Sequence, residues 1–189
     1  MKKISIKTDR LTIRNLSLSD LDNFYAYRSN PEVTKYQGFD IMTKSQCRAF
    51  IEAHSQKLFG KPGEWVQYAI TDHTCGQLIG DCAIKLDMDN IKLATIGMTI
   101  SPLEQRKGFA KETMRGILKF LFEAENLHRV TEIVDAENTA SIRLLQSTGF
   151  KQEGHFIENI FFKGKWGSEF QYALLKKEWE TNCNKEAAL

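Results

Sequence analysis

Apolar and polar residues alternate with a period of two in several short segments of the chain, which is the pattern of half-buried β-strands. The segment 10–16 shows it first, with Leu11 and Ile13 on one side and Thr12 and Arg14 on the other. Equivalent patterns predict strands at 64–72, 76–86, 93–101 and 128–136, and two more at 154–162 and 168–179, joined by the glycine-containing loop 163–167. The sequence therefore predicts about seven strands.

Four other segments space their apolar residues three and four positions apart, as an amphipathic helix does. A helix that begins near residue 17 ends before Pro31, because proline lacks the N–H that continues a helix. Helices are also predicted at 43–60, with Thr43 as N-cap, at 108–122 and at 138–149. We expect one α/β (α+β) domain, residues 1–189, in which about four helices flank a central, mixed, mostly antiparallel sheet.

Composition narrows the class of protein. With 42% hydrophobic and 11% aromatic residues among 189, the chain can bury a sizeable core. Its 26 basic and 24 acidic residues give a net charge of +2, too balanced for a dedicated nucleic-acid-binding or membrane-surface protein, and we expect neither partner. The N-terminus has no apolar signal-peptide region, and no window reaches the ~18 consecutive apolar residues of a membrane helix.

The four cysteines, Cys47, Cys75, Cys82 and Cys183, are scattered and form no C-x-x-C pair. In a chain of this length they are typical of reduced thiols, so we expect a cytoplasmic protein. His73 lies close to two of them in sequence, but no second pair of ligands accompanies this group. We therefore expect no metal site.

The stretch SPLEQRKGFAKETMRG, residues 101–116, joins a predicted strand to a predicted helix. The first turn of a helix has N–H groups without intrahelical partners, and the helix dipole adds partial positive charge there. The small residues Gly108 and Ala110 let an anion approach this backbone, and Arg106 and Lys107 add full charges. The alternative is an ordinary loop-to-helix junction on a basic surface. Neither the P-loop motif nor the three-glycine dinucleotide motif is present.

A second candidate lies in DAENTASIRLLQSTGF, residues 135–150, which places Asn138 directly before a helix and Ser141 on its first turn. Both residues also have an ordinary structural interpretation, with Asn138 as the N-cap. The order of elements favours a functional interpretation: strand, anion-binding loop, helix, strand, and then Asn-x-x-Ser, helix and Gly-Phe.

With these motifs in this order, the chain resembles the GCN5-related N-acetyltransferase (GNAT) superfamily, and within it the ribosomal-protein N-terminal acetyltransferase (Rim-type) branch. The family's acetyl-CoA signature, (Gln/Arg)-x-x-Gly-x-(Gly/Ala), is matched by Gln105, Gly108 and Ala110, with Glu112 following as in many Rim-type members. The preceding strand IGMTISP, the Asn-x-x-Ser helix, the opening strand and helix, and the closing hairpin KGKWGSEFQYALLKKEW are also similar. The resemblance spans about residues 8–180.

The resemblance implies a sheet with one splayed pair of strands and acetyl-CoA as co-substrate, without a metal. In the family, the pantetheine arm pairs with the strand before the signature loop like an added strand, and the loop backbone holds the pyrophosphate. Asn138 would contact the pantetheine arm, and the Ser141 hydroxyl would protonate the departing thiolate, which also leaves tolerably without an acid. The implied cofactor-binding residues are Met98, Thr99, Ile100, Gln105, Arg106, Lys107, Gly108, Phe109, Ala110, Asn138 and Ser141.

The acceptor side carries fewer signals. An amine attacks only when it is neutral, so a base or a water chain must take its proton. Glu158, which faces the acceptor side in related proteins, is the leading candidate for this base, ahead of Asp81, Tyr68 and His155; a solvated strand carboxylate is the alternative for it. Four aromatic residues could line an acceptor pocket or pack elsewhere: Tyr36, Phe39, Trp65 and Trp166.

The resulting expectation is a GNAT-type N-acetyltransferase that moves an acetyl group from acetyl-CoA to a primary amine, with Ser141 and Glu158 as catalytic residues. The expected acceptor is the N-terminal α-amine of a protein or peptide. Branch members often carry an aspartate near the last hairpin where this chain has Ser168-Glu169, which leaves acceptor recognition open. The alternatives are a small-molecule acceptor (a polyamine, an amino acid or an antibiotic amine) and a non-catalytic acyl-CoA-binding module. We expect a monomer or a homodimer.

Overall fold

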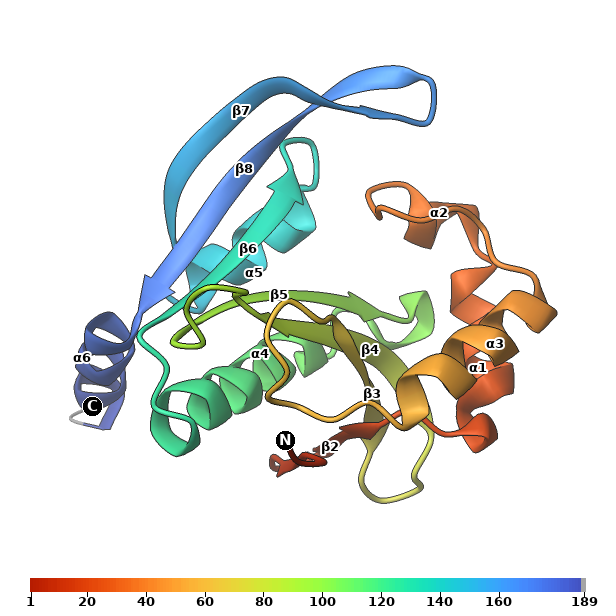
Figure 1. Ribbon diagram of the computed structural model, residues 1–189, viewed down its shortest axis with the longest axis horizontal. Helices are drawn as coiled ribbons and strands as arrows, with labels where there is room; N and C mark the ends of the chain where they lie inside the picture. The colour runs from red at the N-terminus through yellow and green to blue at the C-terminus, as the bar shows by residue number, and fades with distance from the viewer. Residues whose placement is uncertain (188–189) are drawn as a thin grey trace.

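In the computed structural model, which describes residues 1–187, one sheet of eight strands forms the centre of the molecule (Figure 1). Across the sheet the strands follow the order β1-β2-β3-β4-β5-β6-β8-β7. Their bounds are Ser5–Lys7 (β1), Leu11–Asn15 (β2), Val66–Asp72 (β3), Leu78–Leu86 (β4), Leu93–Ile100 (β5), Arg129–Asp135 (β6), Lys151–Phe162 (β7) and Lys165–Leu175 (β8). The predicted α/β domain with a mostly antiparallel mixed sheet is confirmed.

Among the strands of the described chain, β5 and β6 are the one parallel pair of neighbours, and the sheet opens between them; the other neighbouring strands are antiparallel. β5 and β6 pair only through residues 93–95 and 129–131. Beyond these residues β5 continues to Ile100 and β6 to Asp135, and in the described chain they do not pair with each other again. This is the expected splayed pair, and the opening positions the site.

Among residues 1–187, six α-helices pack around the sheet: α1 (Leu21–Arg28), α2 (Pro31–Thr34), α3 (Lys44–Ser55), α4 (Phe109–Lys119), α5 (Thr139–Ser147) and α6 (Lys176–Ala187). Short 3₁₀ turns lie at Leu18–Asp20 and Pro102–Glu104, and α4 continues into a π-helical turn at Phe120–Ala124. None of the helices described is both long enough and apolar enough to cross a membrane.

Two buried apolar clusters form the core, one on each face of the sheet. Met114 of α4 belongs to the first cluster, and Phe24 of α1 and Ile51 of α3 belong to the second. Neighbouring residues of β3 divide between them, Tyr68 in the first and Ala69 in the second, because successive side chains of a strand point to opposite faces. Each face of the sheet therefore has its own helical cover.

The hairpin of β7 and β8 extends past β6 and curves toward α2 (Figure 1). Its pairing register shifts twice, between Gln152 and Gly154 and between Phe156 and Ile160. Such irregularities bend a strand and increase its twist. The hairpin thereby forms one wall of a cleft whose other wall is the segment around α2.

Three elements differ from the sequence prediction. The strand β1 was not predicted, and Pro31 begins the helix α2, where its missing N–H is one that would have no partner in any case. The last strand ends at Leu175 and not at residue 179, because α6 begins at Lys176. Trp179 of this helix is buried and lies against the ring of Phe122, so tertiary packing stabilises a segment with few apolar residues.

Candidate active site

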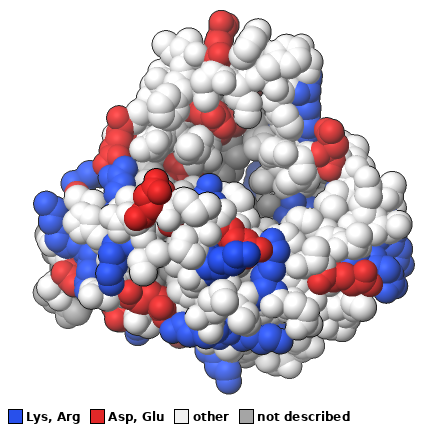
Figure 2. Space-filling model, in the orientation of Figure 1, with Lys and Arg blue, Asp and Glu red and all other residues white. Residues whose placement is uncertain are grey.

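Three cavities meet where β5 and β6 part. The loop cavity, about 660 Å³, is lined by the end of β5, the loop before α4 and the first turns of α5. The inner chamber, about 640 Å³, is lined by β3, β4, β5, α3 and the segment 37–42. The outer cleft, about 720 Å³, lies between the segment 31–41 and the β7–β8 hairpin, and Figure 2 shows the molecule hollowed there. Met98 and Thr99 line both the loop cavity and the inner chamber, and Gln37 lines all three.

The loop before α4 has the geometry of an anion cradle. Arg106 has a φ of 63° and Gly108 a φ of 84°, so two residues of this short loop adopt left-handed conformations. Gly108 is the N-cap of α4 and makes no side-chain cap, which leaves the first-turn N–H groups for another acceptor. A Cβ atom added at Gly108 would lie 3.4 Å from Nη2 of Arg10, so the glycine keeps this approach narrow but open.

The turn before β2 holds this loop in place through Glu112, on the first turn of α4. Oε1 of Glu112 accepts from the Thr8 hydroxyl (2.6 Å) and from the Arg10 N–H (2.8 Å), while Oε2 accepts from Nε of Arg10 (2.7 Å). Partial burial works to raise the pKa of Glu112, but these hydrogen bonds outweigh it and lower the pKa. Nη1 of Arg10 also donates to the Lys107 carbonyl oxygen (3.1 Å), which fixes the loop backbone directly.

The start of α5 closes the loop cavity from the other side. Oδ1 of Asn138 accepts from the Ser141 N–H at 3.2 Å, so Asn138 is an N-cap as well as a cavity residue. Nε2 of Gln105 donates to the Ile100 carbonyl oxygen at 3.1 Å and ties the loop to the end of β5. The cavity brings together all the cofactor-binding candidates except Lys107, which pairs with Glu104, and Phe109, which lies under the Arg10 guanidinium.

The inner chamber is lined mostly by apolar and aromatic side chains. Its walls include Phe50 and Trp65 together with Phe39 of the segment before α3. Its floor is the cross-strand pair Ala83 and Gly97, and a Cβ atom added at Gly97 would meet nothing within 4 Å. The small floor residues therefore leave space directly beside the end of β5.

A buried ion pair lies at the base of this chamber. Asp81, on β4, is fully buried and accepts from the Tyr27 hydroxyl (2.7 Å), from Nη2 of Arg28 and from the side-chain amide of Gln67. The Arg28 guanidinium lies 4.0 Å from the ring centroid of Phe39. Burial, together with the Asp81 charge, raises the pKa of Tyr27 well above its usual value. The charges of Arg28 and Asp81 therefore compensate each other at the base of the chamber.

His54 of α3 also lines the inner chamber. Burial, reinforced by the charge of Lys57, lowers the pKa of His54 to about 4, so the imidazole is neutral at pH 7. Its Nδ1 atom accepts from the Gln67 backbone N–H at 3.2 Å. That bond assigns the proton of the neutral ring to Nε2.

The family described as "Acetyltransferase (GNAT) domain" matches residues 10–151, which include the loop, α4, β6 and α5. The chain is a GNAT acetyltransferase. It is 33% identical over 177 residues to "Uncharacterized N-acetyltransferase p20" of Bacillus licheniformis, which covers 93% of this chain and 98% of that protein. The crystal structure of a GNAT-family acetyltransferase from Bacillus anthracis has a TM-score of 0.82 at 27% identity and covers 93% of this chain and 100% of its own.

Two further relatives have names that state an acceptor, and each matches about half of this acetyltransferase. Spermidine N(1)-acetyltransferase of Vibrio cholerae is 30% identical over 86 residues, 46% of this chain and 50% of that protein. YdaF of Bacillus subtilis, provisionally named a ribosomal N-acetyltransferase, is 31% identical over 106 residues, 56% of this chain and 57% of that protein. Each name describes the acceptor of that relative and not of this chain.

The outer cleft of the acetyltransferase carries charges of both signs. Lys165 lies 3.6 Å from a carboxylate oxygen of Glu137, and Nζ of Lys163 donates to the Thr34 carbonyl oxygen. Figure 2 likewise shows acidic and basic side chains interspersed over this face. The charged residues that line the cleft are Glu32, Lys35, Asp40, Asp135, Glu137, Lys163, Lys165 and Glu169, five acidic and three basic.

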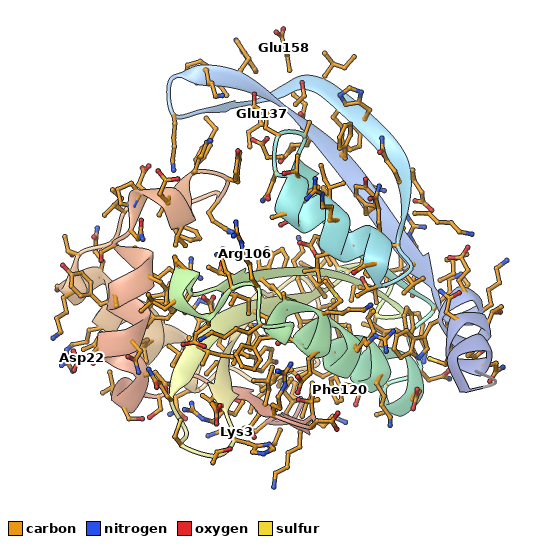
Figure 3. The ribbon with its side chains drawn as sticks, turned by 180° about the vertical axis from the view of Figure 1, so that it is seen from behind. Lys3, Asp22, Arg106, Phe120, Glu137 and Glu158 are labelled. Carbon is orange, nitrogen blue, oxygen red and sulfur yellow. The ribbon has the colours of Figure 1, made fainter. Side chains whose placement is uncertain are left out.

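The structure places the expected base Glu158 outside all three cavities. It lies in the second irregularity of β7 with a φ of 47°, its N–H donates to Oγ of Ser168 (3.0 Å), and its side chain is exposed. Figure 3 shows it projecting from the far side of the hairpin, away from the cleft. Of the alternative bases, Tyr68 is fully buried, with a pKa that burial raises, and His155 packs beside Phe170 on the hairpin.

The four aromatic candidates divide between the site and the hairpin. Phe39 and Trp65 line the inner chamber, and Tyr36 lines both the outer cleft and the loop cavity. Trp166 is 59% exposed, packs edge-on against Phe161 near the hairpin tip and lines none of the three cavities.

One titratable group of β6 had not been singled out from the sequence. Glu132 is only 8% exposed, its Oε2 has no hydrogen-bond partner among the described residues, and burial raises its pKa to about 8. The signal was present in the sequence, since a glutamate stands between Val130 and Val134 at positions of the strand that face the core.

Proposed function

We propose that this acetyltransferase transfers the acetyl group of acetyl-CoA to the α-amine of a peptide or protein N-terminus. The observation that carries the proposal is that the loop cavity and the inner chamber share Met98 and Thr99 at the end of β5. A thioester bound from one side thus meets an amine arriving from the other. The open left-handed Gly108 and the bare first turn of α4 fit a pyrophosphate at the entrance.

Acetyl-CoA supplies the thioester, and the chain supplies position and charge. The loop 105–108 and the first turn of α4 bind the pyrophosphate through backbone N–H groups. The unpaired edge of β5 near Met98 and Thr99 binds the pantetheine amides and polarises the thioester carbonyl. Ser141, on the opposite wall, donates a proton to the departing thiolate. The amine attacks directly, so no side chain of the enzyme becomes acylated.

An α-amine suits a site without a dedicated base. Its pKa of roughly 7.7–8.0 leaves a sizeable neutral fraction at physiological pH, whereas a lysine amine near ~10.4 is almost fully protonated. Asp81, the carboxylate buried beneath the chamber, is occupied by Tyr27, Arg28 and Gln67. Glu158 faces away from the chamber. Solvent in the outer cleft then takes the proton of the amine.

A polyamine is the second candidate acceptor. The outer cleft has five carboxylates and three lysines, an excess that favours cations. Of the two relatives that match over about half of their length, one is named for spermidine and the other is provisionally named a ribosomal N-acetyltransferase; the second name agrees with the Rim-type resemblance. We also place the enzyme in the cytoplasm, in keeping with the free thiols of Cys47, Cys75 and Cys82.

Release of free thiol from acetyl-CoA at pH 7.5 tests the proposal. The acceptors are unblocked peptides, the same peptides with blocked N-termini and an internal lysine, and spermidine. We expect the unblocked peptides to have the highest kcat/KM. Faster turnover of spermidine would instead identify the acceptor as a polyamine. Binding of acetyl-CoA without turnover of any amine would identify a binding module.

A further inference from the structure

We propose that the inner chamber binds the side chain of the residue that carries the acceptor amine, and that this side chain is uncharged and apolar or aromatic. The inference rests on the proposed function, because it names the class of α-amine that the enzyme takes. It follows from the lining, the charge and the connections of the chamber.

The lining matches an apolar side chain. Phe50 and Trp65 form aromatic walls, and Ile41 and Met42 add aliphatic surface. A Cβ atom added at Gly97 would meet nothing within 4 Å, so the floor beside the end of β5 is empty space. Ligand pockets of this kind gain affinity mainly from buried apolar contact.

The charges of the chamber disfavour an ionised acceptor side chain. Arg28 and Asp81 form a buried pair, with side chains only 4% and 0% exposed, so the guanidinium that lines the chamber already has its charge compensated by Asp81. His54 is neutral at pH 7 because its pKa is about 4. An ammonium or carboxylate on the acceptor side chain would lose its hydration in a mostly apolar lining whose guanidinium is already paired, which is costly. Among the described residues, Asp40 is the carboxylate that lines the chamber, and it lies at the wall shared with the outer cleft.

The connections of the chamber orient the acceptor. Met98 and Thr99 connect it to the loop cavity, where the thioester would lie, while Gly38, Asp40 and Ile41 connect it to the outer cleft. A side chain held in the chamber would therefore leave its own amine beside β5 and let the following peptide run out along the cleft. Because the chamber is connected to the outer cleft, an acceptor that arrives through the cleft can reach it. This favours an acceptor side chain as the occupant over a longer acyl chain, which would enter from the loop cavity.

Peptides that differ only in their first residue test the inference. We expect kcat/KM for Leu, Met or Phe to exceed that for Asp or Lys by at least about tenfold. In Gly97→Leu, whose side chain would fill the floor, we expect the rate with the Leu peptide to fall by at least tenfold, while the dissociation constant of acetyl-CoA is unchanged. Ile91→Ala, at an exposed position outside the cavities, is the control and should behave as the wild type.

The possible outcomes separate the two proposals. Turnover of all first residues at similar rates, or fastest turnover of Asp or Lys, would overturn this inference and leave the proposed function standing. Failure to acetylate any α-amine would overturn both. If Gly97→Leu instead abolished turnover of hexanoyl-CoA and left the first-residue preference intact, the chamber would be an acyl site. The first-residue series on the wild-type enzyme decides the question even if Gly97→Leu does not fold.

Discussion

Nε of Arg10 lies 2.7 Å from Oε2 of Glu112, which joins the turn before β2 to the first turn of α4, 102 residues away in sequence. Because Arg10 also holds the Lys107 carbonyl, Glu112 positions the loop without lining the loop cavity. Glu112→Gln should weaken acetyl-CoA binding about tenfold while kcat at saturation stays near the wild-type value, since charge-assisted hydrogen bonds are replaced by neutral ones. Calorimetric titration and steady-state kinetics measure the two effects.

The control for Glu112→Gln is Glu153→Gln. Glu153 also accepts two bonds from one arginine, Arg129, but lies on β7 far from the loop. Its substitution should leave acetyl-CoA affinity unchanged. Equal losses in both variants would mean that Glu112 acts only through general stability.

Gly108→Val should weaken acetyl-CoA binding by more than about tenfold. The residue has a φ of 84°, a conformation that β-branched side chains avoid, and its side chain would stand where the phosphate approaches. Gly76→Val imposes comparable backbone strain at a φ of 73° with nothing within 4 Å, on the turn between β3 and β4. A folded Gly108→Val protein that binds acetyl-CoA as tightly as Gly76→Val would refute the anion cradle.

Ser141→Ala should lower kcat by about ten- to a hundredfold with little change in acetyl-CoA affinity, because the hydroxyl would act on the departing thiolate in the transition state. Ser147→Ala is the matched control: it lies on the same helix and lines the same cavity, but its Oγ donates to the Leu144 carbonyl oxygen. Single-turnover measurements keep chemistry rate-limiting. An unchanged rate in Ser141→Ala would show that Ser141 does not donate the proton and is only a residue of the first helical turn.

Glu132 should make the protein less stable as pH rises. Its pKa is about 8 in the folded state against an ordinary value of 4.5, so the folded state holds its proton more tightly than the unfolded state does. The contribution of Glu132 to the free energy of unfolding is therefore fully present below pH 4.5. It falls by about 4 kcal/mol as the pH rises toward 8. Urea unfolding from pH 5 to 8.5 measures it. Glu132→Gln should flatten this dependence, and an equally steep curve in the variant would assign it to other groups.

Local signals were enough for the elements that carry the loop cavity. A strand, small residues at a helix start and Asn-x-x-Ser are each readable within a few residues, and all but two of the predicted cofactor-binding positions line one cavity. The helix α6 was missed because its stability comes from Trp179 packing on Phe122, which are far apart in sequence. Pro31 was interpreted as a helix end although it also suits a first helical turn.

The positions of the acceptor-side residues could not be predicted from the sequence, for a geometric reason. Where Glu158 points depends on two register shifts in β7, and a shift of one residue turns a side chain to the opposite face of a strand. The pair Arg28 and Asp81 forms between elements 53 residues apart, so no local pattern announces that Asp81 is already occupied. Both facts belong to tertiary structure.

The parting of β5 and β6 also links the enzyme's lifetime to its substrate. A sheet with an unfilled gap forgoes backbone hydrogen bonds, and a ligand that fills the gap binds the native state alone. At a hundred times its dissociation constant, such a ligand adds about 2.7 kcal/mol to the free energy of unfolding. Acetyl-CoA would thus protect the chain from proteolysis and heat in proportion to its concentration, and starvation for acetyl-CoA would shorten the enzyme's survival as well as its turnover.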